Sequence, residues 1–248
     1  MRTLKNQTLL YDDDCPLCRV YTSGFINMGM LDRNGKKPYN QLTEKEQIFI
    51  DVNRASNEIA LVDSLNNSVI YGIDSLLKVI GFSFPWIEQV GNVRPIKYFL
   101  RKLYSFVSYN RKVIIPAKIN KNIALQCIPD FSFKYRILFL IFALVTSSVI
   151  LYLFQSEVSL LEIISIQLSV YLFQSLLFLT FSKQITLNYL GNYSVSIFCG
   201  GLLLFPIIVL KSIVVVPKIV CDLYFYIILM VVVIDIIRRV QIIKFNLS

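Results

Sequence analysis

Two cysteines three positions apart, Cys15 and Cys18, directly follow three aspartates in the stretch LLYDDDCPLC. A Cys-x-x-Cys pair can exchange disulfides, bind a metal or serve only as a packing element. The thiolate is the reactive form of cysteine, and neighbouring carboxylates oppose its formation because they raise the pKa of the thiol. The rest of the sequence has to indicate which of these chemistries the pair performs.

The residues around the pair are typical of a strand followed by a helix. Residues 8–12, TLLYD, form a short apolar run that predicts a buried strand. Pro16 suits the first helical position, since proline there lacks only a hydrogen bond that the helix would not make. Cys15 is then the N-cap, facing the positive end of the helix dipole, with Cys18 one turn further along the same face. We expect this helix to continue through MGML and to stop at the turn DRNGK.

Downstream segments complete a small α/β domain. Thr43 and Glu46 have the spacing of a capping box at the start of a helix, and Asn66 with Asn67 joins two apolar runs as a hairpin turn. The expected elements are a strand at 37–42, a helix at 43–52, strands at 58–64 and 68–72, a helix at 73–82 and an amphipathic helix at 94–114. This order predicts a thioredoxin-like core, whose last helix either covers the sheet or lies on a membrane surface.

The second half of the chain is built from long apolar runs. Hydrophobic residues make up 55% of the 248 residues, and after residue 137 they gather in four runs close to the roughly 20 residues that cross a bilayer. We predict an α/β thioredoxin-like N-terminal domain followed by an all-α membrane domain of four transmembrane helices. The boundaries are 1–115 for the first domain, 116–136 for a basic connector and 137–248 for the membrane domain, with spans at 137–154, 158–181, 193–210 and 219–237.

Charged residues beside the spans predict the orientation. Lys134 and Arg136 precede the first span, and Arg238 and Arg239 follow the last, whereas the loop QSEVS between the first two spans has no Lys or Arg. By the positive-inside rule we expect the N-terminal domain and the C-terminus in the cytoplasm. Residues 1–10 lack the apolar stretch of a secretory signal. We therefore expect an integral protein of a bacterial inner membrane with a cytoplasmic dithiol domain.

Charge and composition limit the chemistry further. Residues 94–136 carry ten basic side chains and one acidic, which favours anionic membrane lipid over nucleic acid as a partner, and we expect no nucleic acid. The chain has no histidine, which removes Ser/His/Asp and Cys/His catalysis and the usual zinc sites. We expect no cofactor and no bound metal.

Three cysteines lie outside the pair: Cys127 in the basic connector, and Cys199 and Cys221 in the third and fourth spans. A single cysteine in an apolar helix is usually a small buried hydrophobe, and we expect this of Cys199 and Cys221. A relay of electrons across the membrane would need these two within disulfide distance.

Three motifs resemble the DCC family of thiol-disulfide oxidoreductases, a thioredoxin-like group named for its Asp-Cys-x-x-Cys motif. They are YDDDCPLC near the start, VIYGIDSLLKVIG in the middle and LYSFVSYNRKVI at the end, covering residues 6–115. The chain has Asp13 where the family more often has glycine, and it lacks the proline that precedes the third strand of thioredoxins. The positions that the resemblance implies are the redox pair Cys15 and Cys18, the motif acids Asp12 and Asp14, and the terminal Tyr104, Asn110 and Arg111.

The leading hypothesis is a membrane-anchored thiol-disulfide oxidoreductase that exchanges disulfides with a protein or a small thiol partner. The Cys15 thiolate would attack the substrate disulfide, and Cys18 would resolve the mixed disulfide. A carboxylate, Asp12 or Asp14, would accept the proton. The helix N-terminus lowers the pKa of Cys15 while the aspartates raise it, so we expect a thiol less acidic than a helix cap alone would give.

Other functions stay open. A CxxC with a nearby carboxylate can bind a soft metal, which would make the domain a metal-handling module. Alternatively, the membrane part is a transporter or lipid-interacting bundle with the dithiol as its sensor, or the dithiol is purely structural. Acidic residues within apolar runs are candidates for transport, although Asp235 has Arg238 and Arg239 one turn away and is expected to pair with them. These acids are Glu162, Asp222 and Asp235.

Overall fold

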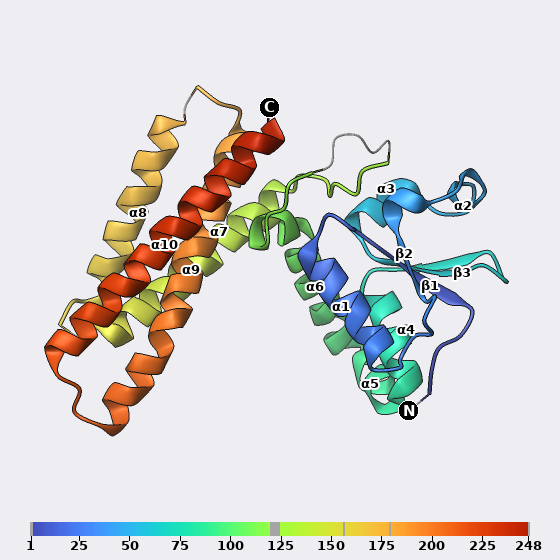
Figure 1. Ribbon diagram of the computed structural model, residues 1–248, viewed down its shortest axis with the longest axis horizontal. Coiled ribbons are helices and arrows are strands. Elements are labelled where there is room, and N and C mark those ends of the chain that lie inside the picture. The colour runs from blue at the N-terminus through green and yellow to red at the C-terminus, as the bar shows by residue number, and fades with distance from the viewer. Residues whose placement is uncertain (1, 120–124, 156, 179, 248) are drawn as a thin grey trace. The chain divides into compact units, whose positions relative to one another are not determined.

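The computed structural model describes residues 2–119, 125–155, 157–178 and 180–247 (Figure 1). It divides the chain into two compact units, Met1–Ser132 and Phe133–Ser248. The first unit combines a small mixed sheet with helices, and the second consists of long apolar helices.

The first unit runs from a strand, a helix and a second strand to two short helices, a hairpin of two strands and three further helices. A 3-10 turn at Tyr39–Gln41 follows the second strand directly. The bounds are β1 Gln7–Tyr11, α1 Pro16–Asn27, β2 Lys36–Pro38, α2 Glu44–Gln47, α3 Val52–Asn57, β3 Ala60–Asp63, β4 Ser68–Tyr71, α4 Ile73–Ser83, α5 Pro85–Gly91 and α6 Arg94–Ile114.

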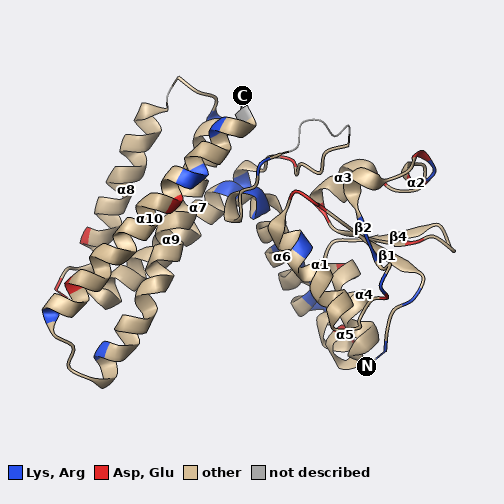
Figure 2. Ribbon diagram, in the orientation of Figure 1, with Lys and Arg blue, Asp and Glu red and all other residues tan. Residues whose placement is uncertain are grey.

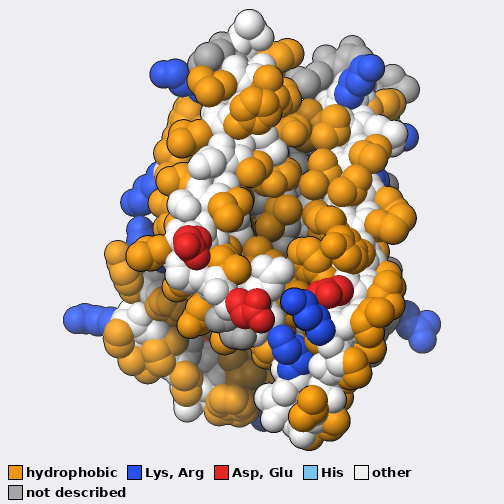
Figure 3. Space-filling view, turned by 90° about the vertical axis from the view of Figure 1, so that its left-hand side faces the viewer, with side chains coloured by type: hydrophobic (Ala, Val, Ile, Leu, Met, Phe, Trp, Pro, Cys, Tyr) orange, Lys and Arg blue, Asp and Glu red, His pale blue; other side chains and the backbone are white. Residues whose placement is uncertain are grey.

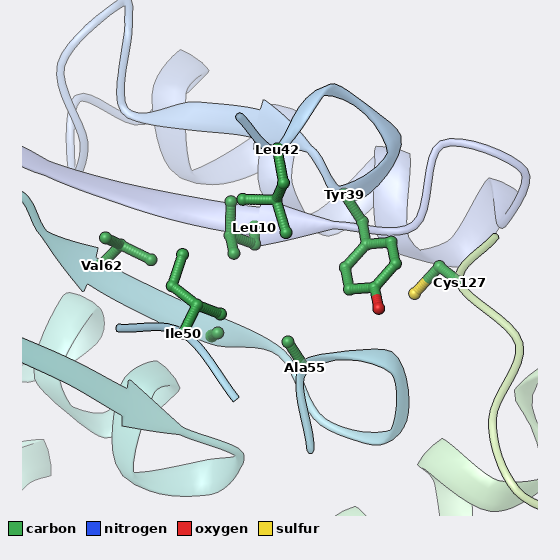
Figure 4. Close-up of a cluster of buried hydrophobic side chains, with 8 residues drawn as sticks. Leu10, Tyr39, Leu42, Ile50, Ala55, Val62 and Cys127 are labelled. Carbon is green, nitrogen blue, oxygen red and sulfur yellow. The ribbon is translucent and has the colours of Figure 1, made fainter. Parts of the chain in front are cut away.

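The four strands form one mixed sheet in the order β2-β1-β3-β4. β1 is parallel to β2 and antiparallel to β3, and β3 forms an antiparallel hairpin with β4. Because side chains alternate along a strand, Leu9 and Leu61 enter one core while Leu10 and Val62 enter the other. Side chains of α1, α4 and α6 cover the first face. The second face of the sheet is covered by residues around Ala55 of α3 and by the extended segment after α6 (Figure 4).

Two helices differ from the expected lengths. α1 ends at Asn27 because Gly29 adopts a φ of 69°, and the N–H of Met30 closes the helix on the carbonyl of Phe25 at 2.8 Å. The predicted helix at 43–52 is instead two short helices. The capping box of Thr43 and Glu46 is confirmed, but it opens a helix of only four residues, and Asp51 then caps α3.

Helix α6 agrees with the predicted amphipathic helix at 94–114. Its second half is packed into the unit, with Ser108, Asn110 and Arg111 buried, whereas Tyr98 and Phe99 in the first half are exposed. The second half of α6 therefore covers the sheet, as one of the two predictions has it. Only the first half of α6 remains available to lie on a membrane surface.

The second unit contains four helices, and each is long and apolar enough to cross a membrane. Four candidate spans confirm the predicted count in the described chain. Charged side chains are sparse along these helices (Figure 2), and hydrophobic side chains dominate the face drawn in Figure 3. The helices are α7 Phe133–Phe154, α8 Leu160–Leu177, α9 Lys183–Ile213 and α10 Lys218–Leu247.

Small residues bring these helices close together. A Cβ atom added at Gly200 of α9 would overlap the side chain of Val232 of α10, which is the close backbone approach typical of membrane helix pairs. In the same unit the hydroxyl of Tyr171 donates to Ser194 at 2.7 Å, so a buried polar contact joins α8 to α9.

Candidate functional site: a buried dithiol

The turn between β1 and α1 places the two cysteines. Cys15 is the N-cap of α1 with φ −100° and ψ 109°, as expected, and Pro16 occupies the first helical position. The Cys15 N–H donates to the Asp12 carbonyl at 3.2 Å, and the Asp14 N–H donates to the Asp12 carboxylate at 3.1 Å. Both bonds tighten the turn, in the manner of aspartates that bond to backbone two residues on. The two cysteines are free thiols, and both are buried.

One proton is shared unequally between the two sulfurs. The Cys18 thiol donates a hydrogen bond to Cys15, and this bond lowers the pKa of the Cys15 thiol to about 6 from an ordinary value of 9.0. Burial and the charge of Asp12 raise that pKa, and Arg111 lowers it further. The same hydrogen bond, followed by burial, raises the pKa of Cys18. The charged form therefore forms first on Cys15, and Cys18 keeps its proton.

The helix N-terminus contributes as expected from the sequence, through the backbone N–H of Cys18, but the sequence did not indicate the hydrogen bond from the Cys18 thiol. The cap geometry is present, but the largest lowering effect on the pKa of Cys15 comes from the Cys18 thiol. Hydrogen bonds to the charged form of a group favour that form, and burial strengthens them.

A buried arginine lies beside the pair. The guanidinium of Arg111 is 6% exposed and donates to the carbonyls of Ser56 at 2.7 Å and Asn57 at 3.3 Å. These carbonyls belong to the last turn of α3, a position that favours a cation because its carbonyls lack helical partners. Burial lowers the pKa of Arg111, but the acidic groups around it, which include Asp12 and the three thiols, outweigh burial and raise that pKa.

Asp12 is the acid that meets these cations. Its carboxylate is 3% exposed and lies 2.7 Å from the ammonium of Lys112 and 3.6 Å from Nε of Arg111. Asp13 is exposed and Asp14 half-buried, and Asp14 contributes its backbone N–H to this turn. Of the two candidate proton acceptors, Asp12 is thus held in an ion-pair network with Lys112 and Arg111.

A third cysteine joins the site from far along the chain. Sγ of Cys127 accepts a hydrogen bond from Arg111 at 3.4 Å and lies near the Ser56 carbonyl at 3.7 Å. Burial raises the pKa of the Cys127 thiol to about 12, although Arg111 opposes this. In Figure 4 its side chain lies beside the ring of Tyr39 at the edge of the buried cluster. The segment predicted as a basic connector therefore contributes a thiol to the dithiol site.

Helix α6 presents polar groups to this site at helical spacing. Tyr104 accepts the backbone N–H of Ile59 through its hydroxyl at 2.7 Å, and Ser108 and Arg111 bond to the end of α3. Asn110, which also belongs to the terminal motif of the family resemblance, donates through its side chain to the carbonyl of Phe106 within α6. The residues that sequence reasoning left out of the site are Lys112 and Cys127. Arg111 was matched by the terminal motif of the resemblance, without a contact to the dithiol being predicted.

No protein-family model matches the chain, and neither a curated protein nor a solved structure matches it. The geometry of the site therefore carries the functional argument.

The other acidic and cysteine candidates belong to the second unit. Asp235 pairs with Arg238 and Arg239, each at 2.6 Å, so the predicted ion pair is present, although α10 continues for twelve residues beyond it. Ser196 of α9 also donates to Asp235, at 2.7 Å. Glu162 belongs to the capping box that opens α8, where its partner is Ser159 rather than a transported ion.

Cys199 and Cys221 do not form a relay. Gly200 lies against Val232, and eleven positions separate Val232 from Cys221. At about 1.5 Å per helical residue this separates Cys221 from the level of Cys199 by roughly 16 Å, far beyond the reach of a disulfide. Cys221 is buried as expected, but Cys199 is exposed, which corrects the expectation for that residue.

The described residues contain no group of three or more Cys, His, Asp or Glu side chains arranged to hold a metal ion. Two thiols alone do not make a closed structural zinc site, which takes four ligands.

Proposed function

We propose that this chain is a membrane-attached thiol-disulfide oxidoreductase of the DCC family whose redox pair is Cys15 and Cys18. Two thiols react with a substrate disulfide, become joined as a disulfide themselves and release two substrate thiols. In the reverse direction the oxidised pair takes two electrons and two protons from substrate thiols.

One arrangement carries this proposal: two buried free thiols at the start of α1, of which Cys15 is the N-cap and has its pKa lowered to about 6 by the neighbouring Cys18 thiol. A packing-only pair has no need for a stabilised thiolate, whereas thiol-disulfide exchange needs a thiolate as nucleophile and a second thiol to complete the exchange. Arg111 supports the same chemistry because a buried cation stabilises thiolate charge.

The arrangement of the first unit supports the family proposal. We propose a thioredoxin-like fold, because the order β2-β1-β3-β4 has a parallel β1-β2 pair, and the dithiol starts the helix that follows β1. Of the residues matched by the terminal motif, Arg111 donates to the last turn of α3, and Tyr104 accepts from the backbone N–H of Ile59 just before β3. The terminal motif therefore has a structural role in this chain, because two of its residues join α6 to the end of α3 and the start of β3.

For the second unit we propose anchoring in a bacterial inner membrane, with the dithiol unit and the C-terminus in the cytoplasm. The four apolar helices and the Lys and Arg beside the first and last of them support it. Anionic lipid is the proposed membrane partner, although Lys97 and Arg101 pair with Asp74 at 2.8 Å. Part of the basic charge is therefore already neutralised within the protein.

A redox titration tests the proposal. The full chain in detergent is equilibrated with glutathione buffers of increasing oxidation, and free thiols are labelled with a maleimide and counted by mass spectrometry. We expect two thiols to disappear together, and we expect Cys15→Ser and Cys18→Ser to abolish this step. Cys199→Ser, in the second unit, is the matched control and should leave the midpoint unchanged.

The proposal is wrong if both thiols stay labelled at every buffer ratio, or if the step survives Cys15→Ser. Elemental analysis of the same sample addresses the metal-handling alternative, which requires about one equivalent of metal in the wild-type chain and none in Cys15→Ser.

A further inference from the structure

The nucleophile of the proposed exchange is closed off from solvent. Cys15 is 0% exposed, and an apolar cavity of about 260 Å³ beside α1, α4 and α6 is lined by Cys18 but not by Cys15. On the other side of the pair, the turn of Asp12, Asp13 and Asp14 lies against another part of the chain, and only about 10 Å³ of space remains there. A substrate disulfide therefore reaches Cys15 only after a part of the protein moves.

The part that covers this turn is a short extended segment after α6, residues 125–130, which we call the strap. Leu125, Gln126 and Cys127 of the strap line the remaining space opposite the aspartates. Leu125 and Cys127 also pack on the buried cluster that contains Tyr39, and Figure 4 shows the Cys127 side chain beside that ring. The strap therefore closes the turn side of the dithiol.

A few side-chain contacts hold the strap in place. The Asn57 carboxamide at the end of α3 accepts the N–H of Asp130 and donates to its carboxylate, both at 2.7 Å. Sγ of Cys127 accepts from Arg111 at 3.4 Å. In the described part of the chain, residues 125–130 form no hydrogen bond from backbone to backbone. Segments with so few hydrogen bonds open locally at a small fraction of the free energy of global unfolding.

The other walls of the same space are tied more firmly into the unit. Asp12 is buried and pairs with Lys112 and Arg111, so moving it would break an ion-pair network. Tyr39 is buried in the core and donates to the carbonyl of Val52 at 2.9 Å. Of the elements around the turn, the strap is therefore the one that can leave while the sheet stays folded.

We propose that the strap is an autoinhibitory cover over Cys15, and that a protein disulfide reacts with Cys15 only when the contact between Asn57 and Asp130 opens. This inference rests on the thiol-disulfide function proposed above and adds the way in which access to its nucleophile is controlled. Cys15 remains the attacking thiolate, and Cys18 remains the thiol that completes the exchange. The strap sets the fraction of time for which Cys15 can be reached.

Alkylation measures this access directly. The reduced full chain in detergent reacts with iodoacetamide at pH 8, where Cys15 with its pKa of about 6 is a thiolate, and peptide mass spectrometry follows the modification of Cys15. Asn57→Asp keeps the acceptor for the Asp130 N–H but replaces a charge-assisted hydrogen bond with two facing carboxylates. We expect it to speed the alkylation of Cys15 about tenfold, and the single-turnover reduction of insulin, a protein disulfide, by a similar factor.

Two further variants separate release of the strap from damage to the fold. Asn57→Asp combined with Asp130→Asn reverses the pair, because the carboxylate at position 57 then accepts from the amide and the N–H at position 130. We expect this double variant to return to the wild-type rate. Asn53→Asp adds the same charge on the same helix, where Asn53 is exposed and bonds to other described residues through its backbone carbonyl. It is the matched control, with no expected effect.

Three results would count against the proposals, and they are distinguishable. Equal alkylation rates in Asn57→Asp and Asn53→Asp overturn the inference, and so does a double variant that stays as fast as Asn57→Asp. Both leave the redox pair intact, because the glutathione titration above judges that pair independently. If Cys15 and Cys18 form no disulfide in any glutathione buffer, the proposed function fails, and control of exchange by the strap fails with it.

Discussion

Replacing Cys18 with alanine should raise the pKa of the Cys15 thiol from about 6 towards its ordinary value of 9.0. The substitution removes the hydrogen-bond donor that is the largest cause of the low pKa. Of the influences that remain, burial and Asp12 raise the pKa, whereas the backbone N–H of residue 18 and Arg111 lower it. A full return of three pKa units would correspond to about 4 kcal/mol of preference for the thiolate, at about 1.36 kcal/mol per unit. The thiolate fraction at pH 7 would then fall from about 90% to about 1%.

The assay is a pH titration of thiolate absorbance in the full chain, in a background where Cys127, Cys199 and Cys221 are serine. Absorbance is used because alkylation would report the access to a buried sulfur as well as its charge. Cys18→Ser, which retains a hydroxyl donor, should give an intermediate midpoint. A midpoint that stays near 6 in Cys18→Ala would refute the reasoning, because the helix N-terminus and Arg111 would then suffice to hold the thiolate.

The same shift links stability to pH. Cys15 has a lower pKa in the folded chain than its ordinary value, so folding favours its thiolate. This contribution is fully present above pH 9 and is lost as the pH falls through about 6. In Cys18→Ala the free energy of unfolding should lose this dependence between pH 6 and pH 9.

Other substitutions test the scaffold, each read by thermal or denaturant unfolding in detergent. Arg111→Met should cost about 3 kcal/mol because buried acceptors and a carboxylate lose their cation, whereas Arg101→Met, at an exposed ion pair, should cost under about 1 kcal/mol. Tyr104→Phe should cost about 1 kcal/mol, since a buried backbone N–H before β3 loses its acceptor. Gly200→Ala should destabilise the helical unit by its overlap with Val232, and Val232→Ala in the same chain should restore stability.

The parts of the site governed by local rules could be predicted from the sequence. Proline at the first helical position and a cysteine before it fixed the N-cap, and the capping box of Thr43 and Glu46 followed from their spacing. The four runs of apolar residues were enough to predict the four helices of the second unit. The end of α1 was misplaced because the apolar run continues past Gly29, and only the positive φ of that glycine shows where the helix stops.

Contacts between residues far apart in the sequence could not be predicted in the same way. Arg111 and Lys112 lie almost a hundred positions after Asp12, and Cys127 still further. Spacing along one helix places Tyr104, Ser108 and Arg111 on one face, but it does not indicate which element packs against that face. That partner is set by the packing of α6 against the end of α3.

The three aspartates beside the thiols now have different physical consequences. Asp13 is exposed, so water screens its charge from the sulfurs. Asp12 is buried, and an unpaired buried carboxylate would strongly oppose a thiolate nearby. Lys112 and Arg111 neutralise it, and in return Asp12 helps to hold Arg111 near both cysteines. The acidic motif therefore does not disable the thiols, because its buried member fixes the cation that supports their charge.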